Sequence, residues 1–571
     1  MASTVRTPSP RAAPSRASRS VLPLALLLVV VPFVVVAAQM AWRGGPFEFA
    51  GDQAVIGLAV HDASALSQEL GPYSRYGWSH PGPSWYYAMA PWHSLFGGDD
   101  AALVAAGLLT HGLIAALLVG AVHRRSRPAL TLATAGLVAL LALRLPATFF
   151  LDVWNPFALL LPTAALLVLA ARARDGRWTG LLALLITGSY LVQTHVGTAP
   201  LVGTVGATGL IAFVLGRRDE RRAAGTATSA GLPAEERPSV AGTRTVRAPR
   251  RGWTALLGGV LLLMWIPPLV QQLTAPAGEG NLGRLLDFFL LDRQEGAHPT
   301  LGQSVIAVGR VLSVPVYGWD PGPWEMDVSR LPGAVALVLV VQLLAALGLV
   351  VAGRRWLSRG AAWTGVAVLV ALVAAVASAA TVTGVLYWYL LVWVGVLPGV
   401  TAIGYAQLLL DWRAGPVHAR TAELASRRPV LGTLAVLLAV VSVGLGVSWS
   451  RGLNLLPASA GVQAATALVE DALEDREPGS IYVDIHSHDR WPIGAGVIEH
   501  LADDGWDVRV DSGSADLYGS ERVGTGDEPV QLTLVASDDP DVATLAGALG
   551  VDLGSVATEN GPLTVLLATT S

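Results

Sequence analysis

The chain has 571 residues, of which 53% are hydrophobic and 14% are charged, and its mean hydropathy is +0.53. Soluble proteins carry about 25% charged residues, so this composition excludes a wholly soluble chain and indicates an integral membrane protein. A net charge of −4 without a concentrated basic segment gives no support to nucleic-acid binding, and the lack of cysteine excludes disulfides and thiolate chemistry.

Eleven apolar runs follow one another along the chain, close to the length of about 20 residues that spans a bilayer. Residues 1–20 are rich in Ser, Pro and Arg and predict a disordered basic tail before the first run. A cleaved signal peptide is the alternative for that run, but signal peptides usually contain only about 7–15 apolar residues. The runs cover residues 21–42, 101–122, 128–145, 156–171, 178–194, 199–216, 253–271, 333–352, 360–380, 384–410 and 430–449.

Arginines give the predicted orientation, because they collect on the cytoplasmic side of membrane proteins. Every even-numbered run is followed by several of them, which begin at Arg124, Arg172, Arg217, Arg354 and Arg413. The N-terminus is therefore expected in the cytoplasm, and the loops after odd-numbered runs on the outside. We expect a multi-pass protein of the cell inner (plasma) membrane.

The membrane part is predicted to consist of two groups of helices. Residues 21–216 hold six runs and residues 253–450 hold five, and the charged, Gly/Ala/Pro-rich segment 217–252 between them predicts a flexible cytoplasmic linker. Two outer loops are long, at residues 43–97 and 272–332.

Residues 451–571 have a different composition, with short strand-like and helix-like segments. SIYVDI, WDVRVD, VQLTLVA and LTVLLAT predict strands, whereas QAATALVEDALED and GAGVIEHLADD predict helices. The expected fold is an α-helical polytopic membrane protein of about 11 transmembrane helices with a small extracytoplasmic C-terminal α/β domain.

The first outer loop concentrates ionisable and aromatic side chains, which indicates a ligand site. Asp52 would act as a general base, bind a metal or be solvated. Arg75 would hold a phosphate through two parallel donors, and His80 would donate to a leaving oxygen or ligate a metal. The alternative is a structural turn at Pro81-Gly82-Pro83 with ordinary surface side chains.

Other outer loops add polar groups on the same predicted side. Asp152, together with Asp52 and a histidine, would suit a divalent cation such as Mg²⁺ or Mn²⁺. Ionisable residues are nearly absent from the middles of the runs, which counts against an ion-coupled transporter. Further candidates are Arg310 for a phosphate, and Tyr73, Trp78, Asn155, Gln193, His195 and His298 for other substrate contacts.

These motifs resemble the glycosyltransferase C (GT-C) superfamily of polytopic, lipid-linked-sugar-dependent glycosyltransferases, and its actinobacterial members in particular. The shared features are an acidic residue in the first outer loop, here Asp52 in GDQA, and a His-Pro-Pro-like motif, here His80 in HPGP. A second acidic residue between spans three and four, together with the WNP and QTH motifs, extends the resemblance, and Asp152 takes that position. The chain departs from the family at Gln53, where a second acidic residue is common.

The resemblance implies a transferase of cell-envelope biogenesis that takes a sugar from polyprenyl phosphate and inverts its anomeric centre. Asp52 would accept the proton of an acceptor hydroxyl on a glycan, lipid or protein, while Arg75, His80 and Arg310 would stabilise the leaving phosphate. Two alternatives remain: a transporter or flippase of lipid-linked sugars, and a non-catalytic scaffold for envelope assembly. A transferase predicts that Asp52 and His80 line one cavity.

Overall fold

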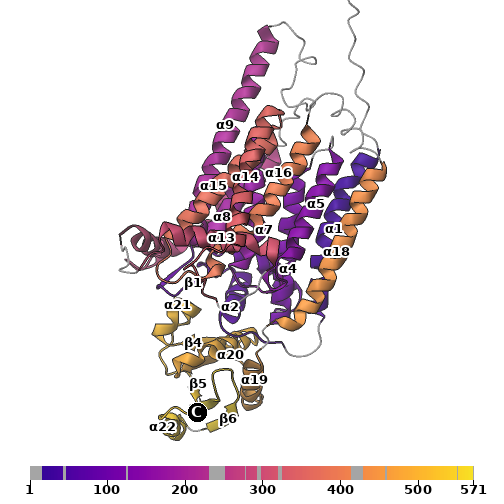
Figure 1. The fold of residues 1–571 in the computed structure, drawn as a ribbon. Coiled ribbons are helices and arrows are strands. Elements are labelled where there is room, and N and C mark those ends of the chain that lie inside the picture. Colours follow the sequence, from indigo (N-terminus) through magenta and orange to yellow (C-terminus); the bar gives the residue numbers. More distant parts are fainter. Residues whose placement is uncertain are drawn as a thin grey trace, which may run out of the picture.

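The computed structural model has a helical membrane part with a C-terminal α/β domain at one end (Figure 1). It describes residues 16–42, 47–123, 127–229, 251–276, 278–291, 297–318, 324–412, 428–456, 459–549 and 551–569. Most of the predicted tail and residues 230–250 of the predicted linker lie outside these ranges.

The predicted polytopic helical fold is confirmed. Among the described residues, nine helical stretches are long and apolar enough to cross a membrane. Two helices of 17 residues, α5 and α8, coincide with the two remaining predicted runs. The helices at the predicted runs are α1 (Arg16–Ala41), α4 (Asp100–Val122), α5 (Pro128–Arg144), α7 (Leu160–Arg172), α8 (Trp178–Thr194), α9 (Ala199–Ser229), α10 (Arg251–Leu263) with α11 (Ile266–Thr274), α14 (Gly333–Arg355), α15 (Arg359–Ala380), η5 (Trp388–Val396) with α16 (Leu397–Asp411), and α18 (Arg428–Gly452).

The stretch that contains α7 lies at the centre of the helices. In its most apolar window 83% of the residues are buried inside the protein, compared with 6% for the stretch Gly252–Thr274, which lies at the periphery. α7 packs against α4, α8, α9 and α15. The loop that leads into α7, which carries Asp152 and the WNP motif, is therefore attached to the most enclosed element of the protein.

Several segments predicted as loops or linker contain helices. The first outer loop folds into α2 (Asp52–Ser64), the hairpin of β1 (Tyr73–Ser74) with β2 (Trp78–Ser79), and α3 (Ser84–Leu95). α9 continues to Ser229, into the segment predicted as a linker. The second long loop contains α12 (Asn281–Leu286), the π-helical turn η4 (Asp287–Leu291) and α13 (Leu301–Tyr317).

The C-terminal domain contains a five-stranded sheet in the order β4-β3-β5-β7-β6. β3 pairs in parallel with β4 and β5, whereas β7 is antiparallel to both β5 and β6. The four predicted strands are present as β3 (Ser480–Ile485), β4 (Asp507–Val510), β5 (Val530–Ala536) and β7 (Leu563–Thr569), and β6 (Val551–Val556) was not predicted. The two predicted helices are α19 (Ala460–Leu473) and α20 (Trp491–Asp503), and α20 packs directly against α2.

Candidate active site

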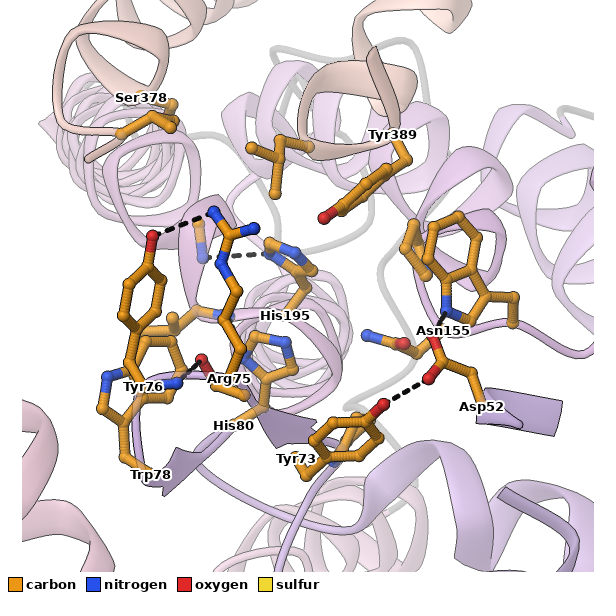
Figure 2. Close-up of a pocket in the computed structure, with 18 of the residues that line it drawn as sticks. Asp52, Tyr73, Arg75, Tyr76, Trp78, His80, Asn155, His195, Ser378 and Tyr389 are labelled. Atoms are coloured by element: carbon orange, nitrogen blue, oxygen red, sulfur yellow. Dashed lines mark hydrogen bonds between the residues drawn. The ribbon is translucent and has the colours of Figure 1, made fainter. Parts of the chain in front are cut away.

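A cavity of about 300 Å³ lies where the first outer loop meets the loop before α7, η4, α15 and η5. Its walls are mostly apolar, with polar groups gathered at a few positions, as in most small-molecule sites. The sequence-predicted residues that line it are Asp52, Tyr73, Arg75, Trp78, His80, Asn155 and His195, and Figure 2 shows them around one space.

One side of the cavity is formed around Asp52, the first residue of α2. The preceding residue, Gly51, has φ of +63°, a conformation that favours glycine. The helix N-terminus itself favours a negative charge at this position. Trp154 donates from Nε1 to Asp52 Oδ2 at 2.9 Å, and the Tyr73 hydroxyl donates to Oδ1. Burial and the neighbouring Asp52 carboxylate raise the pKa of Tyr73, so its hydroxyl remains a donor.

Arg75 lies across the cavity from Asp52 (Figure 2). Its Nη2 donates to the Tyr76 hydroxyl at 3.0 Å, and its guanidinium lies 5.1 Å from the ring centroid of Tyr76 and 5.4 Å from that of Tyr387. Tyr76 in turn donates to the carbonyl of Thr383 at 3.1 Å. Within the described part of the chain, no carboxylate lies within 4.0 Å of the Arg75 nitrogens. The aromatic rings therefore hold this cation without neutralising it.

His80 and His195 lie together on the same side, with ring centroids 4.4 Å apart. The backbone N–H of Val196 donates to His80 Nδ1 at 3.2 Å, and that of Gly197 donates to His195 Nδ1 at 3.1 Å. Each Nδ1 is therefore an acceptor, and in the neutral ring the proton is on Nε2. Burial lowers the pKa of His80 well below its usual value and that of His195 to about 4. At neutral pH both rings are uncharged donors, so neither ring adds a positive charge to the site.

Asp152 lies beside Gln53, the residue that follows Asp52 and at which the sequence departs from the GT-C pattern. Gln53 donates from Nε2 to both Asp152 carboxylate oxygens at 3.2 Å, and the backbone N–H of Trp154 donates to Oδ1 at 2.9 Å. Burial raises the pKa of Asp152 to about 6. All four oxygens of Asp52 and Asp152 thus accept hydrogen bonds.

Asp52, Asp152 and a histidine were expected to share a divalent cation, but in the described part of the chain they do not form a group of three ligands close enough to hold one ion. The uncharged Gln53 amide contacts both Asp152 oxygens, at the position where a second acidic residue is common in the GT-C pattern. Elsewhere among the described residues, two groups close enough to share an ion lie in the C-terminal domain, Glu470–His500–Asp504 and His486–Asp539–Asp541, and both contain exposed acidic residues.

Four predicted residues do not line this cavity: Asp152, which lies beside Gln53, and Gln193, Arg310 and His298. Gln193 is fully buried, accepts from the Ser84 hydroxyl and donates to the Met264 carbonyl at 2.9 Å, so it connects α8 to α3 and to the α10–α11 junction. Arg310 is 3.5 Å from Asp327 on the exposed surface, and His298 Nδ1 is 3.1 Å from the Val382 carbonyl. None of the last three positions brings the side chain to Asp52.

Trp154 is one of the site residues that the sequence prediction did not include; Tyr76, Phe288, Phe289 and Tyr389 are others. The Trp154 ring lines the cavity, donates to Asp52 and contacts the ring of Tyr389 with centroids 4.6 Å apart. The WNP motif was a signal for Trp154, since this residue lies two positions after Asp152 in a predicted outer loop.

Comparison with known proteins identifies the fold. No family model and no curated protein matches the sequence. The structure is similar to that of ArnT from Cupriavidus metallidurans bound to undecaprenyl phosphate, with a TM-score of 0.50 and 12% identity over 96% of this chain and 98% of that chain. The chain has the GT-C fold.

The GT-C fold extends through the C-terminal domain, since nearly the whole chain is covered. The same ArnT in the apo state gives a TM-score of 0.47 at 13% identity, covering 97% of this chain and 100% of that chain. The apo oligosaccharyltransferase of Archaeoglobus fulgidus gives 0.37 at 12% identity, covering 85% of this chain and 64% of that chain. The predicted resemblance to the GT-C superfamily is confirmed at the level of the fold.

Proposed function

We propose that this GT-C protein transfers a sugar from a polyprenyl-phosphate donor to a hydroxyl group of an extracytoplasmic cell-envelope acceptor. The observation that carries the proposal is the polarity of the cavity: the Asp52 carboxylate lies on one side, and Arg75 with the two neutral histidines lies on the other. A base and an anion site that face each other across one small space suit a displacement in which a phosphate leaves. The similar ArnT structure holds undecaprenyl phosphate.

In the proposed reaction the acceptor oxygen attacks the anomeric carbon while Asp52 takes its proton. The new bond joins the acceptor oxygen to the anomeric carbon, and the bond from that carbon to the donor phosphate oxygen breaks. The electron pair leaves with the phosphate, whose charge is stabilised by Arg75 and by Nε2–H of His80 and His195. A single displacement from the side opposite the phosphate inverts the anomeric centre. The hydrogen bonds from Tyr73 and Trp154 orient the Asp52 carboxylate for this step.

The prenyl chain would leave the cavity past η4. Phe288 and Phe289 line the cavity, and the following Leu290 and Leu291 are 68% and 77% exposed. A consecutive exposed apolar turn is costly in water but matches the acyl region of a bilayer. This path supports a lipid-linked donor over a water-soluble sugar nucleotide.

The orientation of the proposed site follows from charge. The arginines that follow the even-numbered runs are expected on the cytoplasmic side, and the loops that form the cavity follow odd-numbered runs. α2 and β1, which supply residues to the cavity lining, lie at the same end of the helices as the C-terminal domain (Figure 1). The acceptor is therefore proposed to be a glycan, lipid or protein outside the cytoplasm.

The test is transfer of radiolabelled sugar from a panel of polyprenyl-phosphate donors by purified protein, with Asp52→Asn in parallel. We expect the variant to lose about 10²–10⁴-fold in kcat, the range in which a general base contributes, and to bind the donor normally. Glu279→Gln, which neutralises an exposed carboxylate in the second long outer loop, is the matched control and should keep wild-type turnover.

Two outcomes would contradict the proposal. Equal turnover by the wild type and Asp52→Asn would remove the base from this position. Absence of transfer from every donor, with movement of the lipid-linked sugar between leaflets instead, would establish a flippase.

A further inference from the structure

The C-terminal domain hydrogen-bonds to the backbone of the segment that leads into α2, including Gly51, which caps the helix. Gly51 donates its N–H to the carbonyl of Pro492, at the start of α20, at 2.8 Å. Ser459, just before α19, donates its N–H to the carbonyl of Glu48 at 2.8 Å. The segment that ends at Asp52 is therefore held by the last domain of the chain as well as by the membrane part.

Close approach of α20 to α2 depends on glycine and on a buried carboxyl group. A side chain at Gly57 would place its Cβ 1.4 Å from Glu499 Oε1, and one at Gly496 would place it 2.5 Å from the Phe49 carbonyl oxygen. Glu499 is hydrogen-bonded to Asp100, which also accepts the backbone N–H of Phe49 at 2.5 Å. Two carboxyl groups bond to each other only when one holds a proton, so this buried contact is specific in geometry and protonation.

The other end of α2 is fixed by a two-bond ion pair. Arg522 donates from Nη1 and Nη2 to the two oxygens of Asp62, each at 2.6 Å, and both side chains are only 14% exposed. His61 adds a contact of 3.1 Å to Asp503 of α20. Asp62 lies ten residues after Asp52 on the same helix, a separation of about 15 Å along its axis.

We propose that the C-terminal domain positions the general base, with Arg522 and Glu499 as positioning residues that act through α2. The domain holds α2 at its first turn, at Gly57 and at Asp62, while the Asp52 carboxylate projects from the first turn into the cavity (Figure 2). A helix held at three points moves as one body, so loss of the distant ion pair shifts the carboxylate against the acceptor oxygen. The inference rests on the proposed function and assigns to the C-terminal domain a role in transfer itself.

The test is a double-mutant cycle of Arg522→Ala with Asp52→Asn, measured as radiolabelled transfer per donor-binding site. A displacement of about 1 Å at a reacting group costs about 10²-fold, so we expect Arg522→Ala to lower kcat about 10- to 100-fold in the wild-type background. It should change the residual kcat of Asp52→Asn less than twofold, because a base that is absent cannot be misplaced. Arg509→Ala is the control, since Arg509 bonds to Asp507 inside the same domain.

A second variant separates positioning from loss of folded protein. Exchange of the pair, Arg522→Asp with Asp62→Arg, restores the attraction and should recover at least a third of wild-type kcat, whereas each single reversal should not. An equal loss from Arg522→Ala in both backgrounds, or no loss in either, would overturn the positioning role while wild-type transfer still stands. Absence of transfer in the wild type would overturn the proposed function itself and this inference with it.

Discussion

The Glu499–Asp100 contact predicts how tightly the C-terminal domain docks at different pH. Burial, followed by the nearby charges of Asp100, Asp503 and Glu48, raises the pKa of Glu499 well above its usual value. In the docked state the pair keeps a proton that an undocked, hydrated Glu499 releases above pH of about 4.5. Because the undocked state binds fewer protons, docking weakens as the pH rises.

The magnitude follows from one proton. Each pH unit over which the docked pair keeps this proton costs about 1.4 kcal/mol, so from pH 5.0 to 6.5 docking loses at most about 2 kcal/mol, or about 30-fold in its equilibrium constant. Above that window His500 adds a second loss of docking free energy. Burial opposes the charged form of His500, but the Glu48 and Glu470 carboxylates raise its pKa to about 9. The contribution of charged His500 to docking is therefore lost as the pH approaches that value. Glu499→Gln keeps a neutral donor beside Asp100 and should reduce the dependence between pH 5.0 and 6.5.

Amide hydrogen exchange at Gly51 and Ser459 measures this opening, because both N–H groups bond across the domain contact. After correction for intrinsic exchange, wild-type protection factors should fall by up to about 30-fold over the window, and those of Glu499→Gln should fall less. Glu474→Gln, on the exposed side of α19, should keep the wild-type slope. The same slope in Glu499→Gln as in the wild type would refute the shared proton.

Three further predictions concern the cavity. Arg75→Ala should raise the KM for the polyprenyl-phosphate donor about 10- to 100-fold, because a charged hydrogen bond contributes about 1.5–3 kcal/mol; an unchanged KM in initial-rate assays would exclude Arg75 from the phosphate site. Gln53→Glu should lower transfer and make it dependent on added Mg²⁺, because it places a second carboxylate beside Asp152. Wild-type transfer should survive EDTA, and its loss in EDTA would show that the wild-type site does use a divalent cation. Raising the pH from about 4 to 6 should lower the unfolding free energy by up to about 3 kcal/mol, since the pKa of Asp152 is raised from 3.8 to about 6 and the folded state favours the neutral acid. Thermal unfolding of Asp152→Asn should lack this contribution. The same pH dependence in Asp152→Asn as in the wild type would refute it.

The sequence was most informative where the physical signal is local. A long apolar run is recognised from its own residues, so all eleven predicted runs coincide with helices. The expectation that outer loops meet on one side led to Asp52, Arg75, His80 and His195, which line the same cavity. Their catalytic roles stay predictions.

Other features depend on contacts between distant segments or on weak local signals. Gln193 and Arg310 were predicted at the site because their loops were expected on the same side of the membrane. Gln193 instead lies in a buried helix junction, and Arg310 forms an exposed ion pair with Asp327. Helix α13 is as long as α5 and α8, at 17 residues each, but it was missed because Gln303, Ser304 and Arg310 interrupt its apolar residues. Thr300 and Gln303 form a capping box that marks its start. The docking of α20 on α2 had no sequence signal beyond small residues at Gly57 and Gly496.

The ion pair between Asp62 and Arg522 also constrains the biosynthesis of the protein. A ribosome makes α2 early, and the arginine that completes its support follows 460 residues later. A nascent or prematurely terminated chain can therefore insert many of its helices and carry Asp52 while lacking the domain that holds it. On the positioning proposal, activity appears only after translation of the last domain, which keeps partly made chains from consuming lipid-linked sugar.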